Sequence, residues 1–132
     1  MNSHLYIIWK DSNNMGIPII DEQHRGIVTT INSLHYFIQN GHGDEIIAPT
    51  LNILLEYTKI HFNAEEKLIT EADYPALEKH KELHKKLVEK TKIIAVEVDI
   101  KNDPTMVLDF LKDWWLNHIN VEDRKYVPYL EA

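Results

Sequence analysis

Three stretches of the chain place histidine and carboxylate side chains one helical turn apart. His61 stands four residues before Glu65, His80 stands four residues before His84, and a third histidine precedes two carboxylates within residues 114–123. Residues four apart in a helix share a face and lie about 6 Å apart along its axis. Apolar residues flank these groups, and burying ionisable groups without a partner is costly. A bound metal ion would make this arrangement favourable.

Four segments have the periodicity of amphipathic helices and would position these groups. We predict helices over residues 19–39, 45–71, 75–97 and 104–121, because apolar side chains recur in each at three- and four-residue steps. Short links join the segments. The predicted fold is therefore all-α, an up-down-up-down four-helix bundle.

Turn and cap signals set the predicted boundaries. Asp44 is a candidate N-cap for the second helix, Asp103–Pro104 is a start signal for the fourth, and Pro128 marks its latest end. Residues 96–100 could also be read as a strand, but no partner strand is evident. An ordered N-terminal arm over residues 1–18 is expected to pack on the bundle through Tyr6, Ile7, Ile8 and Trp9.

The composition excludes several classes of protein. The net charge of −7 argues against nucleic-acid or anionic-membrane binding, and the lack of cysteine excludes disulfides, cysteine zinc sites and iron–sulfur clusters. No apolar run approaches the roughly 18 residues of a membrane helix. The first ten residues do not resemble a signal peptide. We expect one cytoplasmic domain over residues 1–132, without membrane insertion.

The predicted inward faces carry five histidines: His24, His61, His80, His84 and His118. A purely structural core would need a hydrogen-bond partner for each of these imidazoles and for the carboxylates beside them. Five imidazoles and two carboxylates are too many for one tetrahedral zinc ion, and they suit two metal ions with bridging carboxylates. Imidazole and carboxylate together favour iron, with zinc, copper and manganese left open.

Helical spacing leaves the second carboxylate undecided. Glu122 lies four residues after His118 and shares its face, whereas Asp123 lies five residues on and is rotated by about 140°. Periodicity alone therefore favours Glu122. Asp123 could turn inward only if the helix loosens, for instance as a π-type turn, which is common at functional sites.

These residues closely resemble the pattern of the hemerythrin family, in particular its single-domain bacterial members. That pattern is a histidine in the first helix, His-x-x-x-Glu in the second, His-x-x-x-His in the third and His-x-x-x-x-Asp in the fourth. The matching residues here are His24, His61, Glu65, His80, His84, His118 and Asp123. The first stands in the segment Ile20–His24, which also resembles the family. The resemblance covers essentially the whole chain and favours Asp123 over Glu122.

The resemblance implies a non-haem di-iron centre. One iron would be bound by His80, His84 and His118, and the other by His24 and His61. The glutamate and aspartate of the pattern would bridge the two ions, together with an oxo or hydroxo bridge. The two-histidine iron would keep an open position for dioxygen.

On this resemblance we expect reversible dioxygen binding for oxygen transport, storage or delivery, by a monomer without enzymatic turnover. An oxygen-consuming protein is a candidate recipient. The ligand balance agrees, because five neutral imidazoles should stabilise high-valent iron less than the glutamates of ferritin-like oxidases do. The alternatives are an oxygen- or redox-sensing module, a di-iron enzyme that consumes peroxide or nitric oxide, an iron store, or a di-zinc structural protein.

An apolar wall is predicted around the dioxygen position. It would consist of Ile27, Phe62, Trp114, Trp115 and Ile119, although plain core packing would explain Phe62 and Trp114 equally well. At Trp115 the family members have a smaller aliphatic residue. Tyr126 could cover the centre. His35 is expected to be a core histidine, and His4 and His42 match no ligand position.

Overall fold

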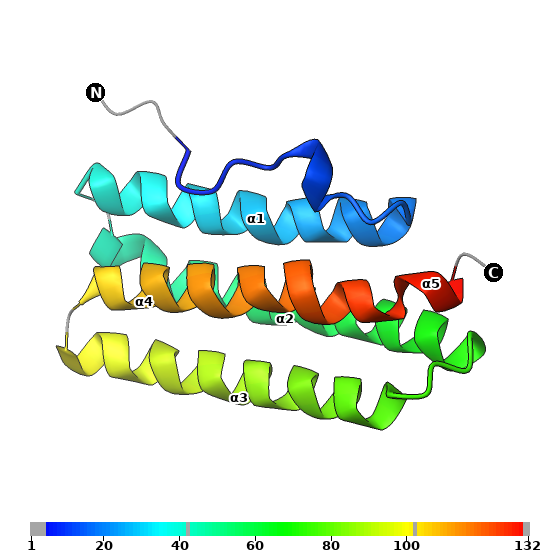
Figure 1. The fold of residues 1–132 in the computed structure, drawn as a ribbon. Helices are drawn as coiled ribbons and strands as arrows, with labels where there is room; N and C mark the ends of the chain where they lie inside the picture. The colour runs from blue at the N-terminus through cyan, green and yellow to red at the C-terminus, as the bar shows by residue number, and fades with distance from the viewer. Residues whose placement is uncertain (1–4, 42, 102, 131–132) are drawn as a thin grey trace.

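Four helical segments run up and down in turn and pack side by side as a bundle (Figure 1). The computed structural model describes residues 5–41, 43–101 and 103–130. Side chains are not described at positions 43, 44, 98–101, 114 and 115. The described ranges contain helices and no strand, so the prediction of an all-α up-down-up-down bundle is confirmed.

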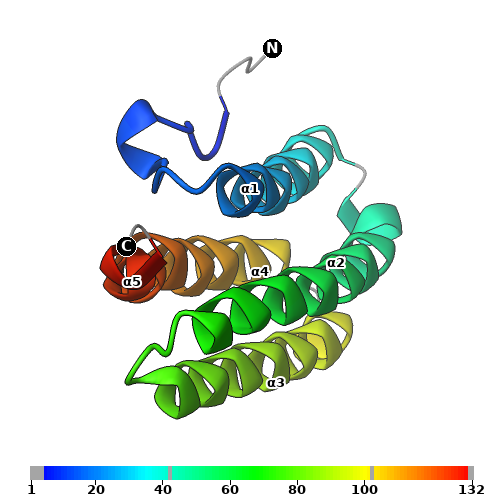
Figure 2. The same cartoon turned by 90° about the vertical axis from the view of Figure 1, so that its right-hand side faces the viewer.

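The first three segments are α1 (Pro18–Gln39), α2 (Gly43–Glu71) and α3 (Leu77–Lys101), and the fourth begins with α4 (Pro104–Phe110). α1 packs on α2 and α4, and α3 packs on the other side of α2 and α4 (Figure 2). The interior between them is apolar over most of its length. Over the described ranges, no helix is long and apolar enough to cross a membrane.

The cap signals placed most helix ends within two or three residues. Asp103 caps α4 by accepting a hydrogen bond from the backbone N–H of Met106 at 3.4 Å. The helix α2 starts before Asp44, whose side chain lies outside the described part of the structure. Residues 96–100 belong to α3 and form no strand, because helical hydrogen bonding continues to Lys101.

The fourth helical segment is irregular beyond α4. Two π-helical turns, Leu111–Trp115 and His118–Glu122, are followed by a 3-10 turn over Asp123–Tyr126 and by α5 (Val127–Leu130). The fourth helix itself ends before Pro128, as predicted, but a new short helix, α5, contains this proline. A proline is tolerated in the first turn of a helix, where its missing N–H costs no intrahelical bond, and α5 begins at the residue before it.

The N-terminal arm runs along α1 (Figure 1). The side-chain amide of Asn32 bonds to both the backbone N–H and the carbonyl of Ile7, each at 2.8 Å, and Ile7 is buried. Tyr6 and Trp9 are half-buried against the bundle. Ile8 is 63% exposed, so its predicted packing is wrong. Because Asn32 holds Ile7 with its side chain towards the bundle, the side chain of the next residue, Ile8, points to solvent.

The arm also reaches the fourth helical segment. The side-chain amide of Asn13 donates a hydrogen bond to Oδ1 of Asn120 at 2.9 Å, within the second π turn. The guanidinium of Arg124 donates to the backbone carbonyl of Ser12. The arm therefore bridges α1 and the segment that carries His118 and Asp123.

Candidate metal centre

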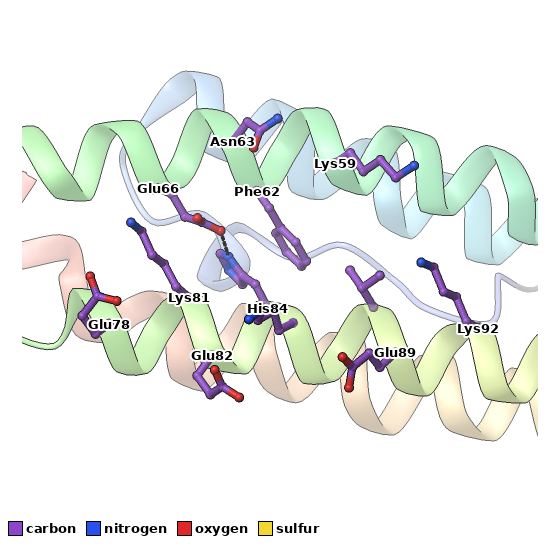
Figure 3. Close-up of a pocket in the computed structure, with 12 residues that line it drawn as sticks. Lys59, Phe62, Asn63, Glu66, Glu78, Lys81, Glu82, His84, Glu89 and Lys92 are labelled. Atoms are coloured by element: carbon purple, nitrogen blue, oxygen red, sulfur yellow. Dashed lines mark hydrogen bonds and ion pairs between the residues drawn. The ribbon is translucent and has the colours of Figure 1, made fainter.

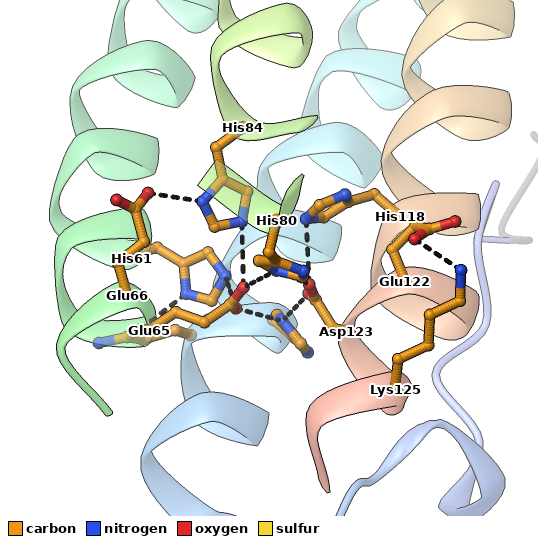
Figure 4. A network of polar contacts seen from close by, with 11 residues as sticks. His61, Glu65, Glu66, His80, His84, His118, Glu122, Asp123 and Lys125 are labelled. Atoms are coloured by element: carbon orange, nitrogen blue, oxygen red, sulfur yellow. Dashed lines mark hydrogen bonds and ion pairs between the residues drawn. The ribbon is translucent and has the colours of Figure 1, made fainter. Parts of the chain in front are cut away.

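The structure brings all seven predicted ligand residues together inside the bundle (Figure 4). They come from α1, α2, α3 and the fourth helical segment, and none is more than 6% exposed. The residues are His24, His61, Glu65, His80, His84, His118 and Asp123. They form two overlapping groups, and the candidate ligand atoms within each group lie within 4.8 Å of one another.

The two groups share both carboxylates. The three-histidine group consists of Glu65, His80, His84, His118 and Asp123. The two-histidine group consists of His24, His61, Glu65 and Asp123. Two metal positions with common carboxylate ligands would produce this pattern.

Glu65 directs one oxygen towards each group. Its Oε1 lies 2.7 Å from Nε2 of His80 and 3.0 Å from Nε2 of His84. Its Oε2 lies 3.1 Å from Nε2 of His61 and 3.8 Å from Nε2 of His24. The carboxylate therefore stands between the two sets of imidazoles, as a bridging ligand must.

The two carboxylate oxygens of Asp123 are likewise directed towards different groups of imidazoles. Its Oδ1 lies 3.0 Å from Nε2 of His80 and 3.0 Å from Nε2 of His118. Its Oδ2 lies 3.0 Å from Nε2 of His24. The two carboxylates thus approach the imidazoles from α2 and from the fourth helical segment (Figure 4).

A π turn explains why Asp123 faces inward. The backbone N–H of Asp123 donates to the carbonyl of His118, five residues earlier, so position i+5 stands over His118 where a regular helix would place i+4. Glu122 instead pairs with Lys125 at 2.9 Å near the surface. Helical periodicity was therefore the wrong guide here, and the inward residue is Asp123, as the resemblance implied.

Several buried polar atoms of the cluster lie 3.0–3.8 Å from one another in ion-pair contacts that do not have hydrogen-bond geometry. They include both carboxylate oxygens of Asp123, Oε2 of Glu65 and Nε2 of His24, His61 and His118. Leaving buried polar atoms unsatisfied costs about 1–3 kcal/mol each. Metal ions would use these nitrogens and oxygens as ligands, so the donor set fits such ions.

The cluster strongly shifts the pKa of its own members. Burial raises the pKa of the Glu65 carboxyl, but the surrounding imidazoles outweigh burial and hold that pKa well below its usual range. Burial lowers the pKa of His24 and His80, but Asp123 and Glu65 outweigh it and raise both to about 9. The carboxylates are therefore ionised, whereas these two imidazoles must lose protons before they bind a metal ion.

Two residues outside the cluster hold its histidines, and sequence reasoning gave neither of them this role. Nδ1 of His61 donates to Oε1 of Gln23 at 2.7 Å, and Nδ1 of His84 donates to Oε2 of Glu66 at 2.7 Å. Each bond turns the opposite nitrogen, Nε2, towards the carboxylates. The sequence offered one signal for this role: Gln23 directly precedes the inward His24, and Glu66 directly follows the inward Glu65.

The predicted apolar wall is buried where it is described. Ile27, Phe62 and Ile119 are at most 5% exposed, and the ring of Phe62 stacks on His84 with centroids 3.6 Å apart. The side chains of Trp114 and Trp115 lie outside the described part of the structure. Contact with dioxygen stays a prediction for all five residues.

Tyr126 lies on the other side of the cluster. It is fully buried, its ring centroid is 5.5 Å from that of His80, and its hydroxyl has no hydrogen-bond partner. Burial and the nearby carboxylates raise its pKa far above the usual value, so the hydroxyl stays protonated. His35 is half-buried and stacks on Tyr6, with centroids 4.6 Å apart. His4 and His42 lie outside the described residues.

The fold and the cluster define a four-helix-bundle protein with a candidate site for two metal ions. Residues 15–130 match the family model of the hemerythrin HHE cation-binding domain, and the chain belongs to the hemerythrin family. It is 36% identical to bacteriohemerythrin of Pseudomonas aeruginosa over 123 residues, which are 92% of this chain and 80% of the relative.

Two further comparisons agree. Bacteriohemerythrin of Methylococcus capsulatus is 34% identical over 121 residues, which are 88% of this chain and 89% of the relative. The crystal structure of a wild-type hemerythrin superposes with a TM-score of 0.83 at 28% identity, covering 96% of this chain and 99% of that protein.

Proposed function

We propose that this protein binds dioxygen reversibly at a non-haem di-iron centre, for oxygen transport, storage or delivery. The observation that carries the proposal is the division of both carboxylates, because Glu65 and Asp123 each offer one oxygen to each group of imidazoles. Membership of the hemerythrin family supports the choice of iron. An oxo or hydroxo bridge would complete such a centre.

Each helical segment supplies its own part of the site. We assign one iron to His80, His84 and His118. We assign the other to His24 and His61, with Glu65 and Asp123 shared. When bound and reduced, the two irons would supply two electrons to dioxygen and recover them on its release. The two-histidine position has one imidazole fewer, and this difference would leave dioxygen a place there.

The surrounding residues would keep water from this position. The candidate ligands lie between two apolar clusters of the bundle. One cluster contains Ile27, Phe62 and Ile119, and the second contains Ile20, Ile69 and Tyr126. A dry site suppresses side reactions such as the loss of partly reduced oxygen. We include Trp114 and Trp115 in this wall from their sequence positions alone.

The ligand balance favours binding over turnover. Neutral imidazoles outnumber carboxylates by five to two in the cluster, and neutral ligands stabilise high-valent iron less than anionic ones. We therefore propose a carrier or store that acts as one domain over residues 1–132, as a monomer, with an oxygen-consuming protein as recipient. Sensing, or consumption of peroxide or nitric oxide, would be the function if oxygen binding proves irreversible.

The test is a visible absorption spectrum of the iron-loaded, reduced protein, recorded without oxygen, then in air, then after degassing. A charge-transfer band that develops in air and disappears on degassing is the expected result. The variant His118→Ala should lose iron from the three-histidine position. A permanent oxidised spectrum in air, or no uptake of iron, would overturn the proposal. Repeated turnover of peroxide with a reductant would favour the enzyme.

A further inference from the structure

The two groups of imidazoles are held from outside by residues of different charge. In the three-histidine group, Nδ1 of His84 donates to the carboxylate of Glu66. In the two-histidine group, Nδ1 of His61 donates to the side-chain amide oxygen of Gln23. One metal position therefore has a negative charge behind a ligand histidine, and the other has a neutral amide in the equivalent place.

The two hydrogen bonds are otherwise alike. Both are 2.7 Å long, and in both the acceptor is an oxygen, which leaves the Nδ1 proton on the imidazole. Nε2 of His84 then lies 3.0 Å from one oxygen of Glu65, and Nε2 of His61 lies 3.1 Å from the other. Because length and tautomer match, charge is the difference that remains between Glu66 and Gln23.

The side chain of Glu66 is partly exposed to water and lies among charged side chains. It lines a groove of about 590 Å³ between α2 and α3, and its side chain is 26% exposed, so water reaches the carboxylate (Figure 3). Charged side chains of both signs line the same groove: Lys59, Lys81, Lys85 and Lys92, with Glu78, Glu82 and Glu89. The ring of Phe62, which also lines the groove, stacks on the buried imidazole of His84.

A charged acceptor changes the metal more than a neutral one does. Hydrogen bonds to an ionised acceptor are roughly twice as strong as neutral ones. A stronger acceptor makes the imidazole more basic, and a more basic ligand stabilises the higher oxidation state of the metal. Changing such an outer partner alters metal affinity by about 10- to 100-fold.

We propose that Glu66 and Gln23 are positioning residues that give the two metal positions unequal reduction potentials. Glu66 lowers the potential of the three-histidine position and tightens its metal, whereas Gln23 leaves the two-histidine position easier to reduce. This inference rests on the proposed function. The two-histidine position, which would take dioxygen, would return readily to the reduced state. The three-histidine position would hold its metal more firmly.

The redox test uses two isosteric variants of the full chain loaded with iron. In Glu66→Gln the amide oxygen can still accept the bond from His84, so only the charge is lost, and the midpoint potential of one iron should rise. In Gln23→Glu a charge is added behind His61, and the midpoint potential of the other iron should fall. Unchanged potentials, or shifts of the opposite sign, would show that Glu66 and Gln23 act only as structural hydrogen-bond partners.

A second measurement separates this inference from dioxygen binding. Cobalt(II) is titrated against a competing chelator into protein stripped of metal, and thermal unfolding checks that each variant folds. Glu66→Gln should weaken one of two cobalt sites by about 10- to 100-fold, and Gln23→Glu should strengthen the other. Equal affinities in all three proteins would overturn the inference. If those differences are found in a protein that fails to release oxygen, the proposed function alone is wrong.

Discussion

Replacing Asp123 with asparagine should destabilise the protein after its metal has been removed with a chelator. Asp123 is fully buried, and its two oxygens lie 3.0 Å from nitrogens of three histidines. Its charge and that of Glu65 are balanced by protonated imidazoles. The variant Asp123→Asn keeps the shape of the side chain and removes one of the two negative charges from a buried site.

The size of the effect follows from the histidines. The pKa of His24 and of His80 is raised from 6.5 to about 9, which corresponds to at most about 3 kcal/mol of stability for each group. This stability is fully present below pH 6.5 and is lost as the pH rises through 9. Asp123 shares the role with Glu65, so its removal should cost about 3 kcal/mol at pH 7. For a chain of this size, the melting temperature would fall by roughly 10 °C.

The assay is urea unfolding of the metal-free protein between pH 6 and 10, followed by circular dichroism. The wild-type protein should lose stability towards pH 10, and Asp123→Asn should lose much less over the same range. The matched control is Glu122→Gln, because Glu122 is the adjacent residue in the sequence and forms an ion pair with Lys125 near the surface. That change should cost less than about 1 kcal/mol. An equally small cost for Asp123→Asn, or an unchanged pH profile, would refute the reasoning.

Three further changes have defined outcomes. Zinc affinity should rise with pH up to about 9, because His24 and His80 must deprotonate before they bind the ion. At pH 7 about two protons should be released per protein, and calorimetry in two buffers measures them. If no protons are released, the raised pKa values of these histidines are contradicted. Asn32→Ala removes both bonds to the arm, should cost about 1–3 kcal/mol, and should speed proteolysis within residues 5–17 relative to Ser33→Ala. Phe62→Ala should cost about 3–5 kcal/mol and hasten irreversible oxidation of the iron-loaded protein; an unchanged oxidation rate would make Phe62 a packing residue only.

The helices could be predicted from the sequence because their signals are local. Apolar periodicity and caps such as Asp103 act within a few residues, so α1 was placed within one residue of its observed start. The prediction was less accurate where two local signals compete. The side chains of residues 96–100 also suit a strand, and the structure continues α3 through them to Lys101, beyond the predicted end at residue 97. Pro128 does not stop the chain from being helical, because it lies in the first turn of the new helix α5, where no intrahelical bond from its nitrogen is needed.

The inward faces of the first three helices could be predicted for the same reason. His24, His61 and His80 lie on regular stretches, where residue number gives direction. The direction of the Asp123 side chain could not be derived from the residues. It depends on a π turn, whereas the periodicity argument assumes a regular α-helix. The contact between His84 and Glu66 was also beyond local rules, since it joins two helices and depends on how they pack.

The contacts of the arm have a consequence for the order in which the protein folds. Asn13 and Asn120 are 107 residues apart in the sequence, and Ser12 and Arg124 are 112 apart. Contacts of such long range close large loops and form slowly compared with pairing of neighbouring helices. During synthesis, His24 leaves the ribosome long before Asp123. If the protein binds two ions as proposed, tight binding would have to wait for the fourth segment, and metal capture would complete folding rather than start it.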